Sequence, residues 1–181
     1  GRLKEDAFLG KGTITISHIE CKSPSLCAVP SQAYIHLDRR LTVGETKQSA
    51  IAEVPEAIAK AGVEASVDVL RYDRPSYTGL VYETDKYFPT WCAAEDSRQV
   101  RAAVDNVRDI LGSAATVGRW TFSTNAVSIA GMFGIPCVGF GPAAEKVAHT
   151  VHDSVPIRHM VTCAAFYAGF GQAYCALAAD Q

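Results

Sequence analysis

Alternation of apolar and polar residues predicts strands in the first part of the chain. Residues 12–21 (GTITISHIEC) and 32–41 (QAYIHLDRRL) alternate and contain β-branched residues, so each is expected to form a half-buried strand. The segment between them is rich in turn residues, and Pro24 and Pro30 oppose the continuation of either strand. The two strands are therefore expected to pair antiparallel.

A helix and a third strand are predicted next. Residues 42–62 place Ala and Ile at helical spacing, with Glu45 in the first turn and Gly62 at the C-terminal cap. Pro55 is expected to kink or divide this helix. Residues 64–75 alternate again and end at a proline. The order strand, strand, helix, strand is most of a split βαβ unit, so we expect a partial ferredoxin-like domain, an antiparallel sheet with a helix.

Helical periodicity marks the start of the second part. Ser97 is a candidate N-cap, and the helix after it is expected to end at Gly112. Its apolar stripe comprises Val100, Val104, Val107, Ile110 and Leu111.

Short buried strands and helices are expected to alternate after this helix. The strands are 116–122 (TVGRWTF) and 136–140 (PCVGF), with a helix from about Asn125 to Phe133 between them and a last helix from Pro156 onward. This alternation is typical of an α/β layer. Two strands are fewer than a parallel sheet buried on both faces requires, so the layer is expected to be incomplete. Because the chain also begins without Met, we expect it to be a fragment.

Composition and charge exclude some classes of partner. The 181 residues are 48% hydrophobic and carry a net charge of -2, which suits one or two small domains with a core. The chain has no Lys/Arg cluster that could bind nucleic acid. No apolar stretch is expected to span a bilayer, and the first dozen residues lack a secretory pattern, so we expect no membrane partner and a cytoplasmic location.

The cysteines indicate the redox state. The six cysteines are scattered without a CxxC pair, mostly in apolar surroundings, so they are expected to be reduced and largely buried. A disulfide or a zinc cluster is the alternative.

Candidate chemistry lies in the loop of residues 139–157, GFGPAAEKVAHTVHDSVPI. His149 and His152 follow a buried strand-like run, at the edge where open α/β sheets bind ligands. Asp153 could orient an imidazole, as carboxylates do beside metal-binding histidines. The alternative is that both histidines are solvated loop residues, and one histidine cannot hold a metal ion by itself.

Several motifs together resemble a known family. Residues 123–157, STNAVSIAGMFGIPCVGFGPAAEKVAHTVHDSVPI, resemble the C-terminal signature of the di-zinc aminoacylase, acetylornithine deacetylase, succinyl-diaminopimelate desuccinylase and carboxypeptidase G family. That signature has a Gly-Thr-Asp-like turn, a helix, GIP, a strand, FGP and a His-Thr-x-x-Glu element. FLGKGT, LDRRLTVGET, YDRPSYTGLVY, YFPTW and FSTN resemble most closely the selenium-metabolism-linked hydrolase subgroup. The resemblance covers essentially the whole chain.

The resemblance implies a domain organisation. Residues 1–79 would be the later part of a lid and dimerisation domain, which is the partial ferredoxin-like unit. Residues 80–181 would be the C-terminal part of an α/β zinc-hydrolase domain.

The resemblance also implies roles for the loop. His149 matches the last metal ligand of the family, whereas His152 matches none. Asp153 stands where the family element has Glu, and it is expected to support the ligand by hydrogen bonding. Ser123, Thr124 and Asn125 are implied to line the substrate site; the alternative is an ordinary N-cap.

Two arginines are implied to bind a substrate carboxylate, for which the guanidinium fork is well suited. Arg40 matches an arginine that reaches the substrate, often across a dimer interface, and Arg74 resembles an arginine-proline element of the carboxypeptidase G branch. The alternatives are ion pairs with Asp38 and Asp73, respectively. Cys27 departs from the pattern, because many relatives carry Asn there.

The implied activity is hydrolysis of the amide bond of an N-acyl or carbamoyl amino acid or a dipeptide. One or two zinc ions would serve as cofactors, with cobalt or manganese as substitutes, and the protein would be a homodimer through its lid. The family's general base and early metal ligands do not occur in this sequence, so we expect no catalytic residue here and no activity of this chain alone. The alternative function is a non-catalytic dimerisation or amino-acid-binding module, although such a module has no need of the His149 loop.

Overall fold

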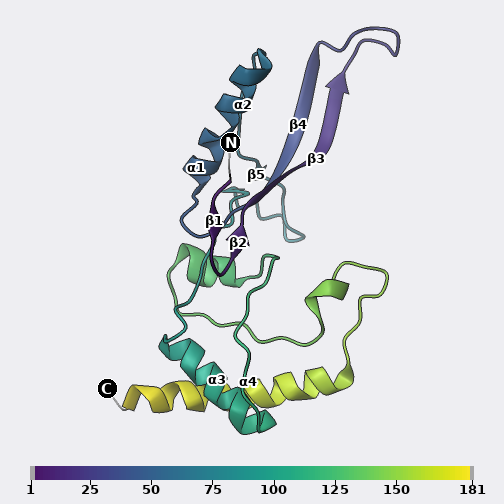
Figure 1. The fold of residues 1–181 in the computed structure, drawn as a ribbon. Coiled ribbons are helices and arrows are strands. Elements are labelled where there is room, and N and C mark those ends of the chain that lie inside the picture. Colours follow the sequence, from purple (N-terminus) through teal and green to yellow (C-terminus); the bar gives the residue numbers. More distant parts are fainter. Residues whose placement is uncertain (1–2, 180–181) are drawn as a thin grey trace. The chain divides into compact units, whose positions relative to one another are not determined.

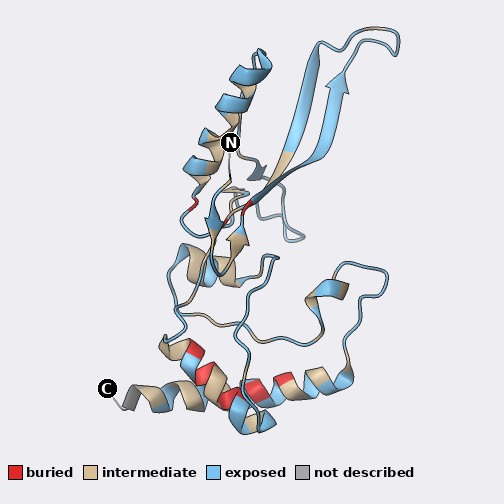
Figure 2. Ribbon diagram, viewed as in Figure 1, coloured by how far each residue is buried: buried red, intermediate tan, exposed pale blue. Residues whose placement is uncertain are grey.

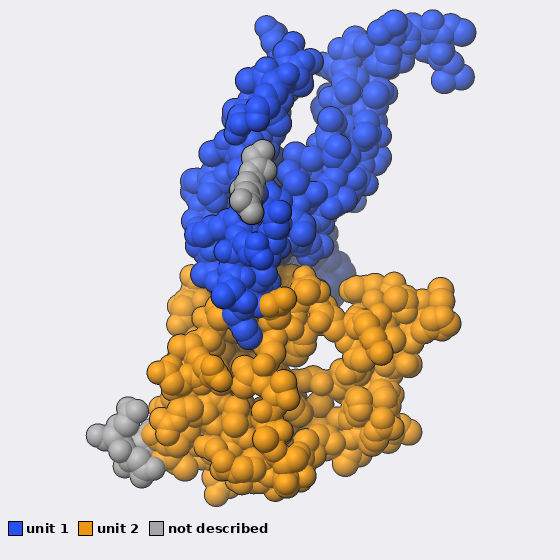
Figure 3. Space-filling view, in the orientation of Figure 1, with its two compact units in different colours: residues 1–90 blue, residues 91–181 orange. Residues whose placement is uncertain are grey.

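The computed structural model describes residues 3–179 (Figure 1). Within it the chain forms two compact units, Gly1–Thr90 and Trp91–Gln181 (Figure 3). The first unit contains small antiparallel sheets and two short helices, and the second contains helices joined by long loops. The division of roles between residues 1–79 and 80–181 stays a prediction.

An antiparallel ribbon of β3 (Thr13–Lys22) and β4 (Gln32–Arg40) confirms the first two strands. Their register pairs Thr13 with Arg40, and it shifts once, between Ile16 and His18. The expected half-burial is wrong for β3, which is exposed along its whole length (Figure 2). A two-stranded ribbon buries a face only when a third strand or a helix covers it, and among the described residues no third strand pairs with this ribbon.

The helix expected over 42–62 is divided, as the proline predicted. Helix α1 spans Lys47–Ala52 and helix α2 spans Val54–Ala61, with Pro55 in the first turn of α2. Gly62 ends α2 in the left-handed conformation, at φ 66°. The sequence therefore located both the break and the end of this helical segment correctly.

Glu45 does not lie in the first turn of α1, contrary to the expectation. Thr46 is the N-cap, because its hydroxyl accepts a hydrogen bond from Ser49 N and Ser49 Oγ accepts one from Thr46 N. Glu45 precedes this capping box and its side chain is turned into the unit, where it is buried.

The third strand is much shorter than residues 64–75. Only β5 (Arg71–Tyr72) forms a strand there, paired antiparallel with β6 (Thr84–Asp85), and the adjoining Leu70 O accepts a 2.7 Å bond from Lys86 N. A further short hairpin joins β1 (Glu5–Asp6) to β2 (Gly10–Lys11). A single helix-covered sheet is not observed among the described residues, so the ferredoxin-like arrangement stays a prediction.

A polar cluster forms the interior of the first unit. Arg39 donates two hydrogen bonds of 3.1 Å to Glu53 and a further bond to Glu45, and its side chain is only 10% exposed. Glu45 also accepts a 2.7 Å bond from Thr42 N, and the Thr42 hydroxyl donates to Gly10 O. Burial alone would lower the pKa of Arg39, but its hydrogen bonds to Glu53 and Glu45 outweigh burial and raise it. We call Arg39, Glu45 and Glu53 the Arg39 cluster.

Two crossing helices build the core of the second unit. Helix α3 (Arg98–Leu111) begins after Ser97 and ends at Gly112, as expected, and it packs against helix α4 (Ile157–Ala179). Figure 2 shows the buried residues of this unit concentrated where the two helices meet. The buried residues of α3 are Val100, Ala102, Ala103, Asn106 and Val107.

The aromatic ring of Phe166 is the centre of this helix pair. Phe166 is 2% exposed, and Asn106 Nδ2 donates a 2.8 Å hydrogen bond to its carbonyl oxygen. Leu111 was expected in the apolar stripe but is 50% exposed, because it is the last residue of α3.

The loops between α3 and α4 differ from the expectation of buried strands. Neither 116–122 nor 136–140 forms a strand, because the described part of the chain offers no neighbouring strand for their backbones to pair with. The helix expected from Asn125 to Phe133 is confirmed as the π-helix Val127–Met132, followed by Gly134 at φ 65°.

Helix α4 also differs from the expectation that no segment could cross a membrane. Ile157–Leu177 is long and apolar enough by length and composition, with a mean hydropathy of 1.2, and 11% of it is buried. A core helix of a soluble protein meets the same criterion. Length and composition therefore leave both environments open for α4.

The cysteines are all free thiols, as expected, but they are less buried than expected. Only Cys163 on α4 is buried, and its burial raises the pKa of the thiol. Cys137 is half-buried, and the others are exposed. Cys21 on β3, Cys175 on α4 and Cys27 and Cys92 in loops lie where no other described element covers them, so their apolar sequence context misled the prediction.

Gly12 tests the packing of the Arg39 cluster. A Cβ at Gly12 would lie 2.6 Å from Arg39 Nη1, 2.8 Å from Glu45 Oε2 and 2.9 Å from Arg40 O. Gly12→Ala is therefore expected to destabilise the protein by about 1–3 kcal/mol in denaturant unfolding, because the backbone carbonyl cannot give way cheaply. Gly118→Ala is the matched control, because a Cβ at Gly118 would have no heavy atom within 4 Å. Equal unfolding midpoints for the two variants would contradict this packing.

Candidate functional site

The loop of residues 139–153, here the histidine loop, carries the strained backbone of the second unit. Ala143 at φ 76° and His149 at φ 62° are the non-glycine residues with positive φ among the described residues. The left-handed conformation costs a side-chain-bearing residue roughly 1–2 kcal/mol, and such residues cluster at functional sites. The residues with strained backbone therefore lie in the loop that the sequence identified as the candidate metal-binding loop.

Helix α4 anchors the start of the histidine loop. Tyr167 Oη donates a hydrogen bond to Phe140 O, and the Phe140 ring stacks on Phe166 at a centroid distance of 4.1 Å. His159 Nδ1 accepts a 3.3 Å bond from Ala143 N. The backbone of Ala143 is thus held in its strained conformation by contacts with a long helix.

The middle of the histidine loop is attached to the segment that precedes the candidate substrate turn. Glu145, in the short 3₁₀ helix Glu145–Val147, accepts a 2.7 Å bond from Thr121 N and a second bond from the Thr121 hydroxyl. These bonds lower the pKa of the Glu145 carboxyl by stabilising its charged form. The Glu145 carboxylate therefore links the histidine loop to the segment around Thr121.

His149 lies at the end of this structure, with its side chain exposed. Its backbone N donates a 3.4 Å bond to Asp153 Oδ2, and Asp153 N bonds back to Thr150 O at 3.1 Å. The Asp153 carboxylate thus supports the turn that presents His149, through the backbone of the histidine. His152 is exposed as well, and its backbone N donates to Thr150 Oγ1.

The described residues cannot hold a metal ion by themselves. Residues 3–179 contain no group of three or more His, Cys, Asp or Glu side chains placed to bind a metal. Zinc requires at least three protein ligands in catalytic sites. The donors of the described residues therefore do not make up a zinc site, and a ligand role for His149 stays a prediction.

The candidate substrate turn, residues 123–125, opens the π-helix. Thr124 O accepts a bond from Val127 N, Asn125 O accepts one from Ser128 N, and Thr124 Oγ1 accepts one from Ala126 N. This local bonding is that of a helix start, the structural alternative considered above. The side chains of Ser123 and Asn125 stay exposed.

The two candidate arginines lie in the first unit and differ in their contacts. Arg40 forms a two-point ion pair with Asp38, at 2.8 and 3.1 Å, with 58% of its side chain exposed. An exposed pair of this kind contributes little stability, about 0–1 kcal/mol, so Asp38 orients Arg40 without sequestering it. Arg74 is exposed, and the alternative considered for it, an ion pair with Asp73, is not present among the described residues. Cys27 is also exposed, in the loop between β3 and β4.

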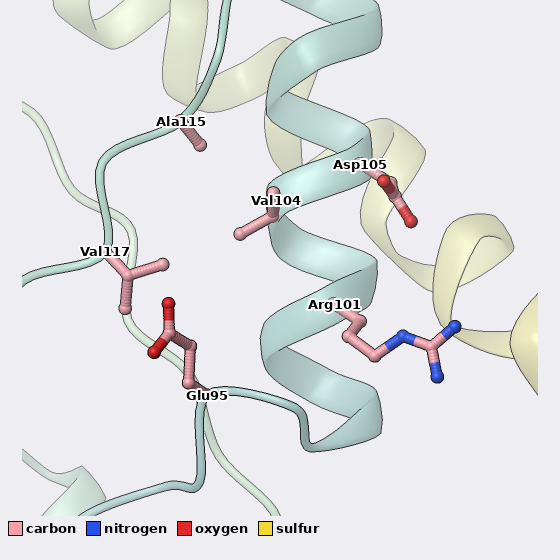
Figure 4. A pocket seen from close by; sticks show the side chains of 6 residues that line it. All are labelled: Glu95, Arg101, Val104, Asp105, Ala115 and Val117. Carbon is pink, nitrogen blue, oxygen red and sulfur yellow. The ribbon is translucent and has the colours of Figure 1, made fainter.

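Two hollows of the second unit are not lined by any of the candidate site residues that the sequence predicted. An open depression of about 440 Å³ is lined by Glu95, Arg101, Val104, Asp105, Ala115 and Val117. Figure 4 shows Val104 pointing toward Ala115 and Val117, whereas Arg101 and Asp105 lie on another side of α3. A smaller hollow of about 250 Å³ lies between the segments 91–93 and 134–137. Sequence patterns gave no signal for either hollow.

Comparison with known proteins identifies relatives that are longer than this chain. No protein-family profile matches the sequence. The chain is 50% identical over 167 residues to the uncharacterized protein YgeY of Escherichia coli K12, and equally to that of Escherichia coli O157:H7. The match covers 92% of this chain and 41% of each relative, so the chain spans less than half of their length.

A solved structure shares the fold. The M20 family metallo-carboxypeptidase Sso-CP2 from Sulfolobus solfataricus matches with a TM-score of 0.62 and 17% sequence identity. The match covers 92% of this chain and 36% of that chain. The mixture of helices and small antiparallel sheets described above is therefore the fold of a part of an M20 metallo-carboxypeptidase.

The strain in the histidine loop can be measured by substitution. Ala143→Gly is expected to stabilise the protein by about 1 kcal/mol in thermal or denaturant unfolding, because glycine adopts φ 76° without the Cβ clash. The neighbouring Ala144 has φ -130°, so Ala144→Gly is expected to destabilise by about 0.5–1 kcal/mol. If both substitutions destabilise alike, Ala143 is not strained.

Proposed function

We propose that this chain is part of an M20-type metal-dependent hydrolase that cleaves the amide bond of an N-acyl or carbamoyl amino acid or of a dipeptide. The fold shared with an M20 metallo-carboxypeptidase over 92% of the chain carries the proposal. The HTVHD motif of residues 149–153 supports it, because the strained backbone lies at the same place. The motifs quoted above favour the selenium-metabolism-linked hydrolase subgroup within this class.

His149 is proposed to be a zinc ligand, and Asp153 is proposed to hold the turn that presents it. The exposed imidazole, the fixed backbone and the nearby carboxylate all suit a metal ligand. When bound, zinc supplies Lewis-acid polarisation of the scissile carbonyl and activation of water. The other ligands and the general base are proposed to come from the rest of the full-length protein, since the described residues bring no third ligand.

Arg40 and Arg74 are proposed to bind the carboxylate of the amino-acid part of the substrate, and residues 123–125 to line its site. Arg40 already presents its fork to a carboxylate, that of Asp38, with two contacts. A substrate carboxylate could exchange with Asp38 at small cost, because the pair is exposed. Arg74 is accessible for the same chemistry.

Homodimer formation through the β3–β4 ribbon is also part of the proposal. Ile14, Ile16 and Ile19 of β3 and Ile35 of β4 are between 43% and 58% exposed, which is unusual for isoleucine in a strand. Exposed edges and apolar side chains of a ribbon favour pairing with another strand. A second copy of the same ribbon would supply that strand with the same pattern.

Zinc content and turnover of the full-length protein test the role of His149. His149→Ala is expected to abolish amide hydrolysis and to lower the zinc bound per chain, because an imidazole ligand is lost. His152→Ala, three residues further along the same exposed turn, is the matched control and should retain zinc and activity. Normal zinc stoichiometry together with full turnover in His149→Ala would contradict the assignment and favour a non-catalytic module.

Paired substrates test the arginines. Arg40→Lys and Arg74→Lys keep the charge but lose the planar fork, so each is expected to raise KM for a carboxylate-bearing substrate by about 10- to 150-fold, the range of a charged hydrogen bond. The corresponding carboxamide substrate should be affected little by either variant. Equal losses on both substrates would show that the arginine acts through structure instead.

A further inference from the structure

The guanidinium of Arg39 binds the backbone of Arg40. Arg39 Nη1 donates a hydrogen bond to Arg40 O, and it lies 3.5 Å from Thr13 O on the paired strand. Thr13 and Arg40 are the cross-strand pair that ends the ribbon. One nitrogen of Arg39 thus contacts both strands at the place from which the Arg40 side chain leaves β4.

Arg39 itself is fixed from several directions. Glu53, between α1 and α2, receives two hydrogen bonds from Arg39 Nε and Nη2, and Glu45 receives another from Nη2. The side chain of Glu45 is 3% exposed, and that of Arg39 is 10% exposed. A buried guanidinium with carboxylates on two sides has little freedom to move, so its contact with Arg40 O is held rigidly.

The residues around the contact between Arg39 and Arg40 O leave room for it and hold the neighbouring backbone. Gly12 lies against both Arg39 Nη1 and Arg40 O, where a Cβ would come within 3 Å of each. Thr42, two residues after Arg40, is fixed by bonds from its backbone N to Glu45 and from its hydroxyl to Gly10 O. The chain on both sides of Arg40 is therefore tied to the Arg39 cluster.

We propose that Arg39 is a positioning residue for Arg40, which sets the direction of the Arg40 guanidinium and thereby the preference for substrates that carry a carboxylate. The inference rests on the proposed role of Arg40. Arg39 contacts no substrate, and it acts through the backbone at the end of β4. Asp38 orients the Arg40 side chain from the exposed side, whereas Arg39 fixes the backbone from the buried side.

The variant Arg39→Lys distinguishes the positioning of Arg40 from a simple requirement for a positive charge at residue 39. A lysine ammonium retains the positive charge opposite Glu45 and Glu53, but it is a single point and cannot also reach the carbonyl of Arg40 in the geometry of a fork. Arg39→Lys should therefore fold, with its fold checked by thermal unfolding. Glu53→Gln, which loosens the fork and leaves Arg39 and Glu45 in place, is the second variant.

The experiment compares KM and kcat in the full-length protein. The substrates are a carboxylate-bearing compound that wild type hydrolyses, chosen from N-acetyl amino acids, N-carbamoyl amino acids and dipeptides, and its carboxamide analogue. Arg39→Lys is expected to raise KM for the carboxylate substrate about tenfold with kcat nearly unchanged and with little effect on the carboxamide. Glu53→Gln should act in the same direction. The double variant with Arg40→Lys should be no worse than Arg40→Lys alone, because both changes remove one interaction.

Arg71→Lys is the matched control, since Arg71 is exposed and pairs with Glu83 and Asp85 on the surface of the same unit. It should leave both substrates unaffected. If Arg40→Lys discriminates between the substrates but Arg39→Lys and Glu53→Gln do not, or slow both alike, the inference is overturned and the proposed function stands. If Arg40→Lys itself does not discriminate, or wild type hydrolyses none of the compounds, the proposed function fails and the inference fails with it.

Discussion

The packing of α4 on α3 around Phe166 is the interaction on which the candidate site depends. Phe166 fills the helix crossing, and the neighbouring residues of α4 reach outward to the histidine loop: Tyr167 binds Phe140 O, and the Phe166 ring stacks on Phe140. The long loops of this unit have few other supports, because no strand pairs within their described residues. Removal of the aromatic ring of Phe166 would therefore weaken both the helix pair and the anchor of the loop that presents His149.

The first unit depends on a different kind of interaction, a buried ion cluster. Its most buried side chains, Thr42 and Glu45, are polar: Glu45 accepts bonds from Arg39 and from Thr42 N, and the Thr42 hydroxyl donates to Gly10 O. Removing one partner of a buried pair leaves an uncompensated charge, which is far more costly than loss of a surface pair. Arg39 and Arg40, adjacent in sequence, thus have opposite environments: the Arg39 side chain is 10% exposed, and the Arg40 side chain is 58% exposed.

The sequence predicted those elements whose stability is local. The β3–β4 ribbon, the break at Pro55 and the caps of α3 follow from patterns within fewer than about thirty residues. The strands at 116–122 and 136–140 could not be judged in the same way, because a strand exists only where another backbone pairs with it. The Arg39 cluster was missed for a related reason. Alternation along β4 places Arg39 on the same face as Ile35 and Leu37, but its carboxylate partners are 6 and 14 residues away in the sequence, and alternation does not identify them. His149 was singled out from its motif, and its left-handed backbone became visible only in three dimensions.

The proposed function requires that the strained turn of the histidine loop present His149 to a metal ion in the full-length protein. The most direct measurement is anomalous X-ray scattering at the zinc edge from crystals of the full-length protein grown with zinc. An anomalous peak is expected about 2.0–2.1 Å from an imidazole nitrogen of His149, with the histidine still at positive φ. A fully occupied zinc site to which His149 contributes no ligand would contradict it.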